Sequence, residues 1–165
     1  MTAAAILRAL VFLATIWTTP YGPILHVRVR RLGGERYLSR IAPHYEAASD
    51  LSGVPLHWLL TVSQAESGLD PNATSSVGAR GLMQLLPGTQ HYREWRQVCR
   101  ADPEQCQAAN LLIGARYLNE CWRVCGAGYG EALARFRGAG CYARPAYEAK
   151  VTTRAKRVKR ILEGK

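Results

Sequence analysis

The chain has 165 residues and the composition of a folded protein. Hydrophobic residues make up 48% of it, with four Trp and eight Tyr, which suffices for one domain with a real core and excludes a disordered chain. The net charge is +10, but the excess lies at the two ends, since residues 41–149 hold nine Arg against ten Asp and Glu. A DNA-reading domain would carry its basic residues in the folded body, so we expect no nucleic-acid partner.

Residues 1–27 have the features of a targeting segment. Arg8 precedes an apolar stretch at residues 9–17, which has the length of a signal-peptide core, and Pro20 and Pro23 interrupt it. No clear small-x-small cleavage site follows, and the basic residues 28, 30 and 31 oppose translocation. Two interpretations stay open, a cleaved signal peptide and an uncleaved membrane anchor. Both predict an exported protein of the periplasm or cell envelope.

Beyond this segment, the apolar spacing and the helix start and stop signals predict helices, with no strand pattern and no internal repeat. A Ser- and Gly-rich connection from Asn72 to Pro87 is long for a link between two helices, so we expect it to be functional. Within it, Gly78 and Gly81 are expected to adopt positive φ. The predicted helices cover residues 37–52, 55–67, 88–100, 103–124, 130–137 and 145–162.

Five cysteines in a small exported chain indicate disulfide bonds. Cys121 and Cys125 lie four residues apart on one predicted helix, where a Cβ separation of about 5–6 Å is wider than disulfide geometry allows. Spacing alone leaves the pairing open. We predict Cys99 with Cys106 and Cys125 with Cys141, with one thiol left over. The four His are not at ligand spacing, so we expect no metal, and we expect no other cofactor.

Glu66 stands at the end of the helix predicted over residues 55–67, with Gly68 just beyond it. The unpaired carbonyl groups at a helix C-terminus disfavour a negative charge, and apolar neighbours add a desolvation cost of the same sign. Both effects raise the pKa of a carboxyl group, so that it can hold a proton near neutral pH and act as a general acid. On this segment alone, a solvated surface glutamate is the commoner explanation.

Three blocks of residues then occur in order along the chain. The second block, residues 110–118, has the form Asn-x-x-x-Gly-x-x-Tyr-Leu, and the third covers residues 132–151. The first block contains Glu66-Ser67, Pro71, Ser75, Gly78-Ala79, Gly81-Leu82-Met83-Gln84 and Pro87-Gly88-Thr89. Together they resemble the soluble lytic transglycosylases, whose catalytic domain has a goose-type lysozyme-like fold. The resemblance covers about residues 36–155 and implies a single all-α, lysozyme-like domain over that range.

The resemblance implies an enzyme that cleaves the β-1,4 bond between N-acetylmuramic acid and N-acetylglucosamine in peptidoglycan. In this family one Glu protonates the glycosidic oxygen and then acts as base on the muramyl 6-hydroxyl, which gives a 1,6-anhydromuramyl product without water. Glu66 matches that residue. Ordinary glycosidases need a second carboxylate, and the nearest candidate, Asp70, precedes Pro71 in what we predict to be a turn. A hydrolytic muramidase is the near alternative.

Further site residues follow from the same resemblance. Ser75 matches a serine near the catalytic site, where its hydroxyl can hydrogen-bond substrate. Gln84 and Met83 match residues that line the sugar groove, although Met83 is equally suited to the core. Tyr117 and Tyr147 are expected to line the cleft, with packing as the alternative for Tyr117. All five are predicted substrate-binding residues.

The chain departs from the family pattern in one place. Where the family has Ala-Tyr-Asn-x-Gly, residues 135–140 read Arg-Phe-Arg-Gly-Ala-Gly. Phe136 keeps the ring without its hydroxyl, and Arg137 replaces an amide that faces the substrate. We expect Arg137 to bind substrate, since a guanidinium can reach a carboxylate of a peptide stem. The same change favours a distant alternative, a weakly active or inactive peptidoglycan-binding accessory of a secretion system or phage particle.

Peptidoglycan glycan strands are the expected partner, and we expect the protein to act as a monomer. Residues 156–165 are predicted to form a basic C-terminal tail, since residues 150–165 hold seven Lys and Arg against one Glu. Such a tail can contact anionic envelope polymers or lipid headgroups. Charges that only keep the protein soluble are an equally good explanation of the tail.

Overall fold

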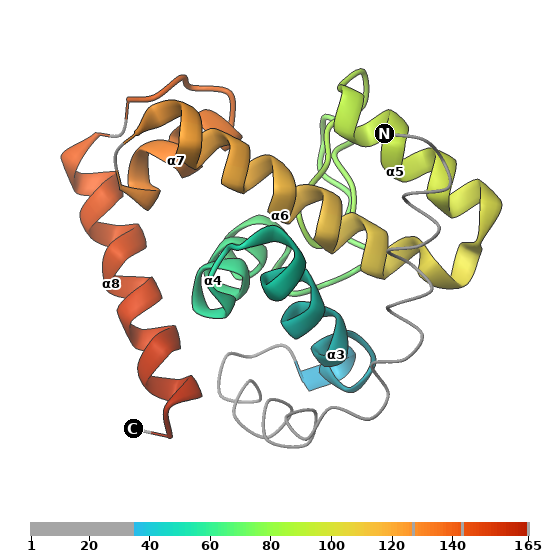
Figure 1. The fold of residues 1–165 in the computed structure, drawn as a ribbon, viewed down its shortest axis with the longest axis horizontal. Coiled ribbons are helices and arrows are strands. Elements are labelled where there is room, and N and C mark those ends of the chain that lie inside the picture. Colours follow the sequence, from blue (N-terminus) through green and yellow to red (C-terminus); the bar gives the residue numbers. More distant parts are fainter. Residues whose placement is uncertain (1–34, 127, 143, 165) are drawn as a thin grey trace.

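We describe the protein from a computed structural model in which residues 35–126, 128–142 and 144–164 are described. Within these ranges the chain is helical, with two isolated β-bridges and no strand (Figure 1). The all-α prediction is confirmed. A short 3₁₀ helix, η3, covers Pro103–Gln105. The α-helices are α3 (Glu35–Ser52), α4 (Leu56–Ser67), α5 (Gln90–Ala101), α6 (Cys106–Cys125), α7 (Tyr129–Phe136) and α8 (Pro145–Leu162).

Helix α6 is the central element of the fold. It crosses the molecule in Figure 1, with α5 at one end and α7 and α8 at the other, and it packs against α3, α5 and α7. Residues 108–115 are buried without a break, which is typical of a helix surrounded by other elements on all sides. Helix α4 packs against α3 and α8. The buried core therefore surrounds the first half of α6.

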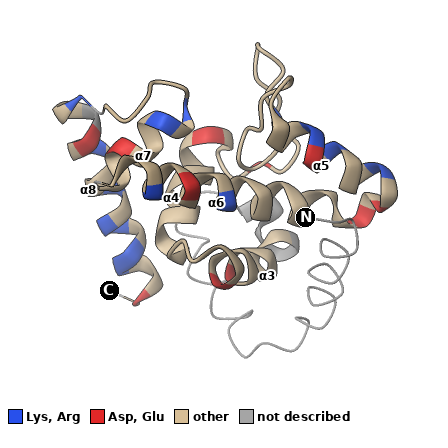
Figure 2. Ribbon diagram, turned by 45° about the horizontal axis from the view of Figure 1, so that its top comes forward, with Lys and Arg blue, Asp and Glu red and all other residues tan. Residues whose placement is uncertain are grey.

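Helix α8 has the bounds predicted for it, residues 145–162. It carries the first part of the predicted basic tail, residues 156–162, and buries Val158 and Ile161. Val151, Ala155 and Val158 are spaced by three and four residues, so they form one apolar face of the helix. Five basic residues of α8 are exposed: Lys150, Lys156, Arg157, Lys159 and Arg160. Arg154 is half-buried, and the blue segments of α8 in Figure 2 mark where Lys and Arg lie along the helix.

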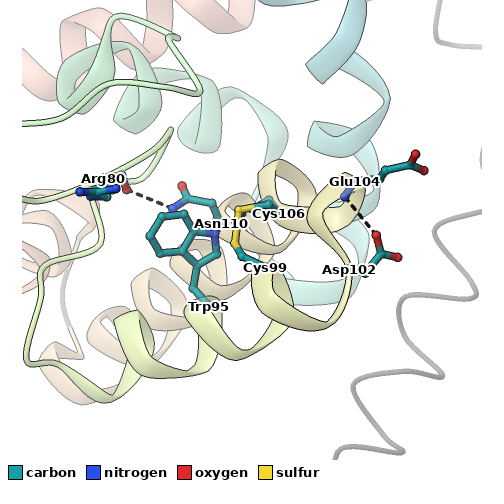
Figure 3. The surroundings of a disulfide bond; sticks show 7 residues. All are labelled: Arg80, Trp95, Cys99, Asp102, Glu104, Cys106 and Asn110. Atoms are coloured by element: carbon teal, nitrogen blue, oxygen red, sulfur yellow. Dashed lines mark hydrogen bonds between the residues drawn. A yellow bond between two sulfur atoms is a disulfide. The ribbon is translucent and has the colours of Figure 1, made fainter.

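Both predicted disulfides are confirmed. Cys99 at the end of α5 bonds Cys106 at the start of α6, with a Cα–Cα distance of 4.5 Å (Figure 3). Cys125 at the end of α6 bonds Cys141 in the segment after α7, with a Cα–Cα distance of 5.2 Å. Cys121 is the remaining thiol and is buried in α6. Each disulfide thus joins one end of α6 to a neighbouring element.

Among the described helices, none has the length and apolar character that a membrane crossing requires. The predicted targeting segment, residues 1–27, lies outside the described residues.

Replacing Cys125 and Cys141 by Ser is expected to lower the free energy of unfolding by about 3 kcal/mol, because the unfolded chain regains the entropy of an open loop. Urea unfolding followed by circular dichroism measures this change. The Cys99→Ser, Cys106→Ser variant is the control, since it opens a shorter loop, with a separation of 7 residues rather than 16, and should lose less stability. Equal stability of the first variant and the oxidised protein would contradict the prediction.

Candidate active site

Glu66 lies in the last turn of α4, and the predicted end of this helix is confirmed. Gly68 adopts the left-handed conformation with φ of 63°, and its amide donates to the carbonyl oxygen of Gln64 at 3.2 Å. A glycine in this conformation is a common way for an α-helix to end. The carboxyl group therefore stands near the negative end of the helix dipole.

The Glu66 side chain is nearly buried, with 11% of its surface exposed. Arg137, in the turn after α7, places its Nε atom 3.2 Å from Oε1 of Glu66. Since Oε1 has no hydrogen-bond partner among the described residues, this contact is an ion pair without hydrogen-bond geometry. Burial raises the pKa of Glu66 above its usual value, and the positive charge of Arg137 opposes this rise without cancelling it.

Glu66 lines a cavity of about 390 Å³, a volume in the range of small-molecule sites. The loop between α4 and α5 forms one side of it, and residues of α5, α6 and α7 form the other. Among the described residues, Glu66 is the only Asp or Glu in the lining. The other lining residues are Ser75, Val77, Ala79, Gln84, Leu85, Leu86, Thr89, His91, Tyr117, Phe136, Arg137 and Gly138.

The loop between α4 and α5 folds back on itself through two β-bridges, Thr74 with Arg80 and Arg80 with Leu85. Gly78 and Gly81 have φ values of 80° and 79°, which confirms the expected positive φ. At Gly81 there is a second constraint, because a Cβ atom would collide with the side chain of Asn110. The glycines thus permit both the turns and the close contact with α6.

Asn110 of α6 holds this loop in place. Its side chain is 1% exposed. Its Nδ2 atom donates to the carbonyl oxygen of Arg80 at 3.0 Å, and its Oδ1 atom accepts from the amide of Met83, also at 3.0 Å. One buried amide therefore satisfies two backbone groups that would otherwise lack partners.

The structure places Ser75 and Gln84, two of the predicted substrate-binding residues, in the cavity lining. Nε2 of Gln84 donates to the carbonyl oxygens of Ala73 at 3.2 Å and Gly81 at 3.0 Å, which leaves Oε1 as the atom that can accept from a ligand. The Ser75 hydroxyl accepts from the amide of Ala79 at 3.0 Å and keeps its proton for donation. The loop thus offers a ligand one acceptor and one donor.

Three aromatic rings from three helices form the wall opposite this loop. Tyr117 of α6 lies between His91 of α5 and Phe136 of α7, with ring centroids 4.2 Å and 5.0 Å apart. The structure therefore places Tyr117 in the cavity lining as well as in a packed row.

His91 was not predicted from the sequence. The Pro-Gly-Thr run at residues 87–89 could have indicated it, because Thr89 caps the N-terminus of α5 and so brings the first turn of that helix to the loop.

Met83 does not line the cavity, which corrects its predicted place in the sugar groove. Its side chain is fully buried, and the Ser63 hydroxyl donates to its sulfur at 3.2 Å. The side chain packs closely on Gly114 of α6, where a Cβ atom would collide with it. The glycine of the second sequence block therefore makes room for Met83, which belongs to the core beneath the loop.

The remaining predicted residues have different outcomes. Arg137 lines the cavity, where its guanidinium contacts Glu66. The backbone of Tyr147 belongs to α8, and its side chain lies outside what the structure describes. Asp70 forms the predicted turn, since its carboxylate accepts from the amide of Asn72 at 2.8 Å, and it does not line the cavity. No cluster of His, Cys, Asp or Glu in the described ranges could hold a metal ion.

Residues 44–156 match the Transglycosylase SLT domain family. The chain belongs to this family. The recognised resemblance to lytic transglycosylases is thereby confirmed, and so is the lysozyme-like all-α fold. Every residue that lines the cavity lies within the matched range.

Curated relatives of this family are similar to the chain over about half of its length. The membrane-bound lytic murein transglycosylase F of Maricaulis maris is 39% identical over 94 residues, which is 56% of this chain and 18% of that protein. The membrane-bound lytic murein transglycosylase F 2 of Alkalilimnicola ehrlichii is 36% identical over 84 residues, 51% of this chain and 17% of that protein. A putative soluble lytic murein transglycosylase of Haemophilus influenzae is 32% identical over 80 residues, 47% of this chain and 14% of that protein.

The chain therefore spans less than a fifth of the length of these relatives. No solved structure gives a significant match.

Replacing Asn110 by Ala is expected to loosen the loop and to lower the free energy of unfolding by about 2 kcal/mol, because the amide of Met83 and the carbonyl of Arg80 lose their partner. Urea unfolding measures the stability, and hydrogen exchange measures the protection of the Met83 amide. The matched control is Asn119→Ala, which removes a bond to the carbonyl of Ser52 elsewhere in the molecule and should leave exchange at Met83 unchanged. If hydrogen exchange at the Met83 amide stayed the same in both variants, the conclusion that Asn110 holds the loop in place would be wrong.

Proposed function

We propose that the chain is a peptidoglycan lytic transglycosylase. It cleaves the β-1,4 bond between N-acetylmuramic acid and N-acetylglucosamine without water and gives a 1,6-anhydromuramyl product. Family membership supports the reaction class, and the names of the curated relatives describe the same activity for those proteins. The observation that carries the proposal is the single nearly buried carboxyl group, Glu66, in the lining of the cavity.

The carboxyl count favours this reaction over ordinary hydrolysis. Retaining and inverting glycosidases use two carboxyl groups on either side of the scissile bond. Glu66 has no carboxylate facing it in the described lining of the cavity. One group then serves as acid and base in turn, first for the leaving oxygen and then for the nucleophile, which in this proposal is a hydroxyl of the substrate.

In the first step, protonated Glu66 gives its proton to the glycosidic oxygen, and the bond from that oxygen to C1 of the muramyl residue breaks. The Glu66 carboxylate then takes the proton of the muramyl 6-hydroxyl, whose oxygen bonds to C1. Glu66 ends the cycle protonated, and no water is consumed. The raised pKa of Glu66 suits the first step, because the free enzyme must hold the proton that it donates.

Two sides of the cavity bind the sugar in this proposal. The Ser75 hydroxyl donates to, and Oε1 of Gln84 accepts from, polar groups of the sugar. The rings of Tyr117, His91 and Phe136 provide the apolar surface that excludes water from the reacting bond. Arg137, half-exposed beside Glu66, reaches a carboxylate of the peptide stem.

The proposed place of action is the cell envelope. The two disulfides fit an oxidising compartment, and residues 1–27 would provide export or anchoring. The exposed basic residues of α8 are suited to contact anionic envelope polymers or lipid headgroups.

Replacing Glu66 by Gln is expected to abolish the release of soluble muropeptides from purified sacculi, because an amide is far too weak an acid to protonate the glycosidic oxygen, while the fold stays intact. Liquid chromatography with mass spectrometry measures the products, and circular dichroism checks the fold. The wild-type protein should release anhydro ends. Reducing ends, heavier by one water, would instead indicate a hydrolytic muramidase. Sacculus binding without any soluble product from the wild-type protein would indicate a binding accessory.

Replacing Arg137 by Asn is expected to move the alkaline fall of kcat/KM to higher pH. Activity requires protonated Glu66 and is lost as the pH rises through its pKa, and the cation lowers that pKa. Without the cation the pKa of Glu66 rises further, so the protonated form persists to higher pH. Arg123→Asn, which removes an exposed arginine outside the cavity lining, is the control and should leave the profile unchanged. A shift to lower pH would disprove the assignment.

A further inference from the structure

A second cavity, of about 320 Å³, lies on the other face of the loop that carries Ser75 and Gln84. It shares no lining residue with the cavity around Glu66. The neighbouring residues Ala79 and Arg80 line different cavities, so the loop is a thin wall between them. The side away from the loop is formed by residues of α5, η3 and α6.

The charges that line this second cavity are all positive. Arg80 from the loop and Arg96 from α5 line it, and no Asp or Glu does so in the described part of the chain. Neither arginine forms an ion pair with a described residue. The nearby carboxylates of Asp102 and Glu104 lie beyond the Cys99–Cys106 disulfide as seen from Arg80 (Figure 3). The two guanidinium groups are therefore available to an anion.

Covalent and hydrogen bonds connect the elements that form the walls of the cavity. The Cys99–Cys106 disulfide joins α5 to α6 at its edge (Figure 3). Nε1 of Trp95 donates to the carbonyl oxygen of Cys106 at 2.9 Å. Asn110 connects the loop to α6 through the carbonyl of Arg80. When the residues of a site are already in place, little of the binding free energy is lost in ordering them as the ligand binds.

We propose that this cavity is a second binding site, which takes a short peptide with a free carboxylate. An arginine presents a planar set of donors that matches a carboxylate in bidentate geometry. Asn72, Thr74 and Gln107 line the same space, and polar groups of these residues can pair with the N–H and C=O groups of a peptide backbone. The volume exceeds that of one inorganic anion, which favours a peptide over free phosphate.

The second site has a direct connection to the first. Ala73 and Gly81 line the second cavity, and their carbonyl oxygens hold Nε2 of Gln84, which lines the first. A peptide bound behind the loop therefore acts on the position of Gln84. The binding itself goes beyond the proposed reaction, because it involves neither Glu66 nor any other residue of the first cavity.

The test is a titration of the full chain with the synthetic tripeptide Ala-Glu-Ala at physiological salt, followed by isothermal calorimetry and by the amide NMR signals of Arg80, Gly81 and Gln107. The free tripeptide is expected to bind and shift these signals, while the form with every carboxylate amidated does not. Arg96→Gln should weaken binding about tenfold, and Arg80→Gln by a similar factor. The matched control is Arg100→Gln, which removes an exposed charge of the same helix outside the lining and should bind as the wild type does.

Several outcomes would overturn the proposal: equal binding of the amidated tripeptide, equal weakening by Arg96→Gln and Arg100→Gln, or tighter binding of inorganic phosphate than of the peptide. The Arg137→Asn variant separates this site from the first cavity, because Arg137 is the cation there that is proposed to reach a peptide carboxylate. It should keep wild-type affinity for the tripeptide, and an affinity lost in that variant would place the peptide in the first cavity and refute a second site.

Discussion

The two hydrogen bonds of the Asn110 side chain are the contact on which both cavities depend. The loop between α4 and α5 does not pair with a β-strand among the described residues. Its position therefore depends on the hydrogen bonds that its backbone makes with Asn110 of α6. Because Asn110 is buried, each of its bonds is made where water cannot compete. Gly81 and Gly114 also permit this contact between the loop and α6. A Cβ atom at Gly81 would collide with the side chain of Asn110, and one at Gly114 would collide with the side chain of Met83.

The electrostatics of Glu66 result from three structural features with opposing effects. The end of α4 and the loss of solvent both favour the protonated carboxyl group, whereas Arg137 favours the carboxylate. The net effect on the pKa of Glu66 is upward because the loss of solvent on burial is the larger of these effects and the charge of Arg137 the smaller. Arg137, where residues 135–140 depart from the family pattern, thus lowers the pKa of Glu66 without reversing its upward shift.

Local signals made much of this structure predictable. Helix ends were readable from prolines, glycines and apolar spacing, and the end of α4 located Glu66. Contacts between distant segments were not readable, because they depend on how helices pack. Met83 has the pattern of a groove residue, yet Gly114 admits it to the core. The pairing of Glu66 with Arg137 depends on where α7 ends relative to α4, which no local pattern encodes.

The aromatic row of His91, Tyr117 and Phe136 limits how the site can open. Its rings come from α5, α6 and α7, and two covalent bonds attach α5 and the segment after α7 to the ends of α6. Moving this wall outward would mean separating α5 and the segment after α7 from α6 against these bonds. Any widening of the cavity would therefore come from the facing loop, whose hydrogen bonds to α6 are those of Asn110.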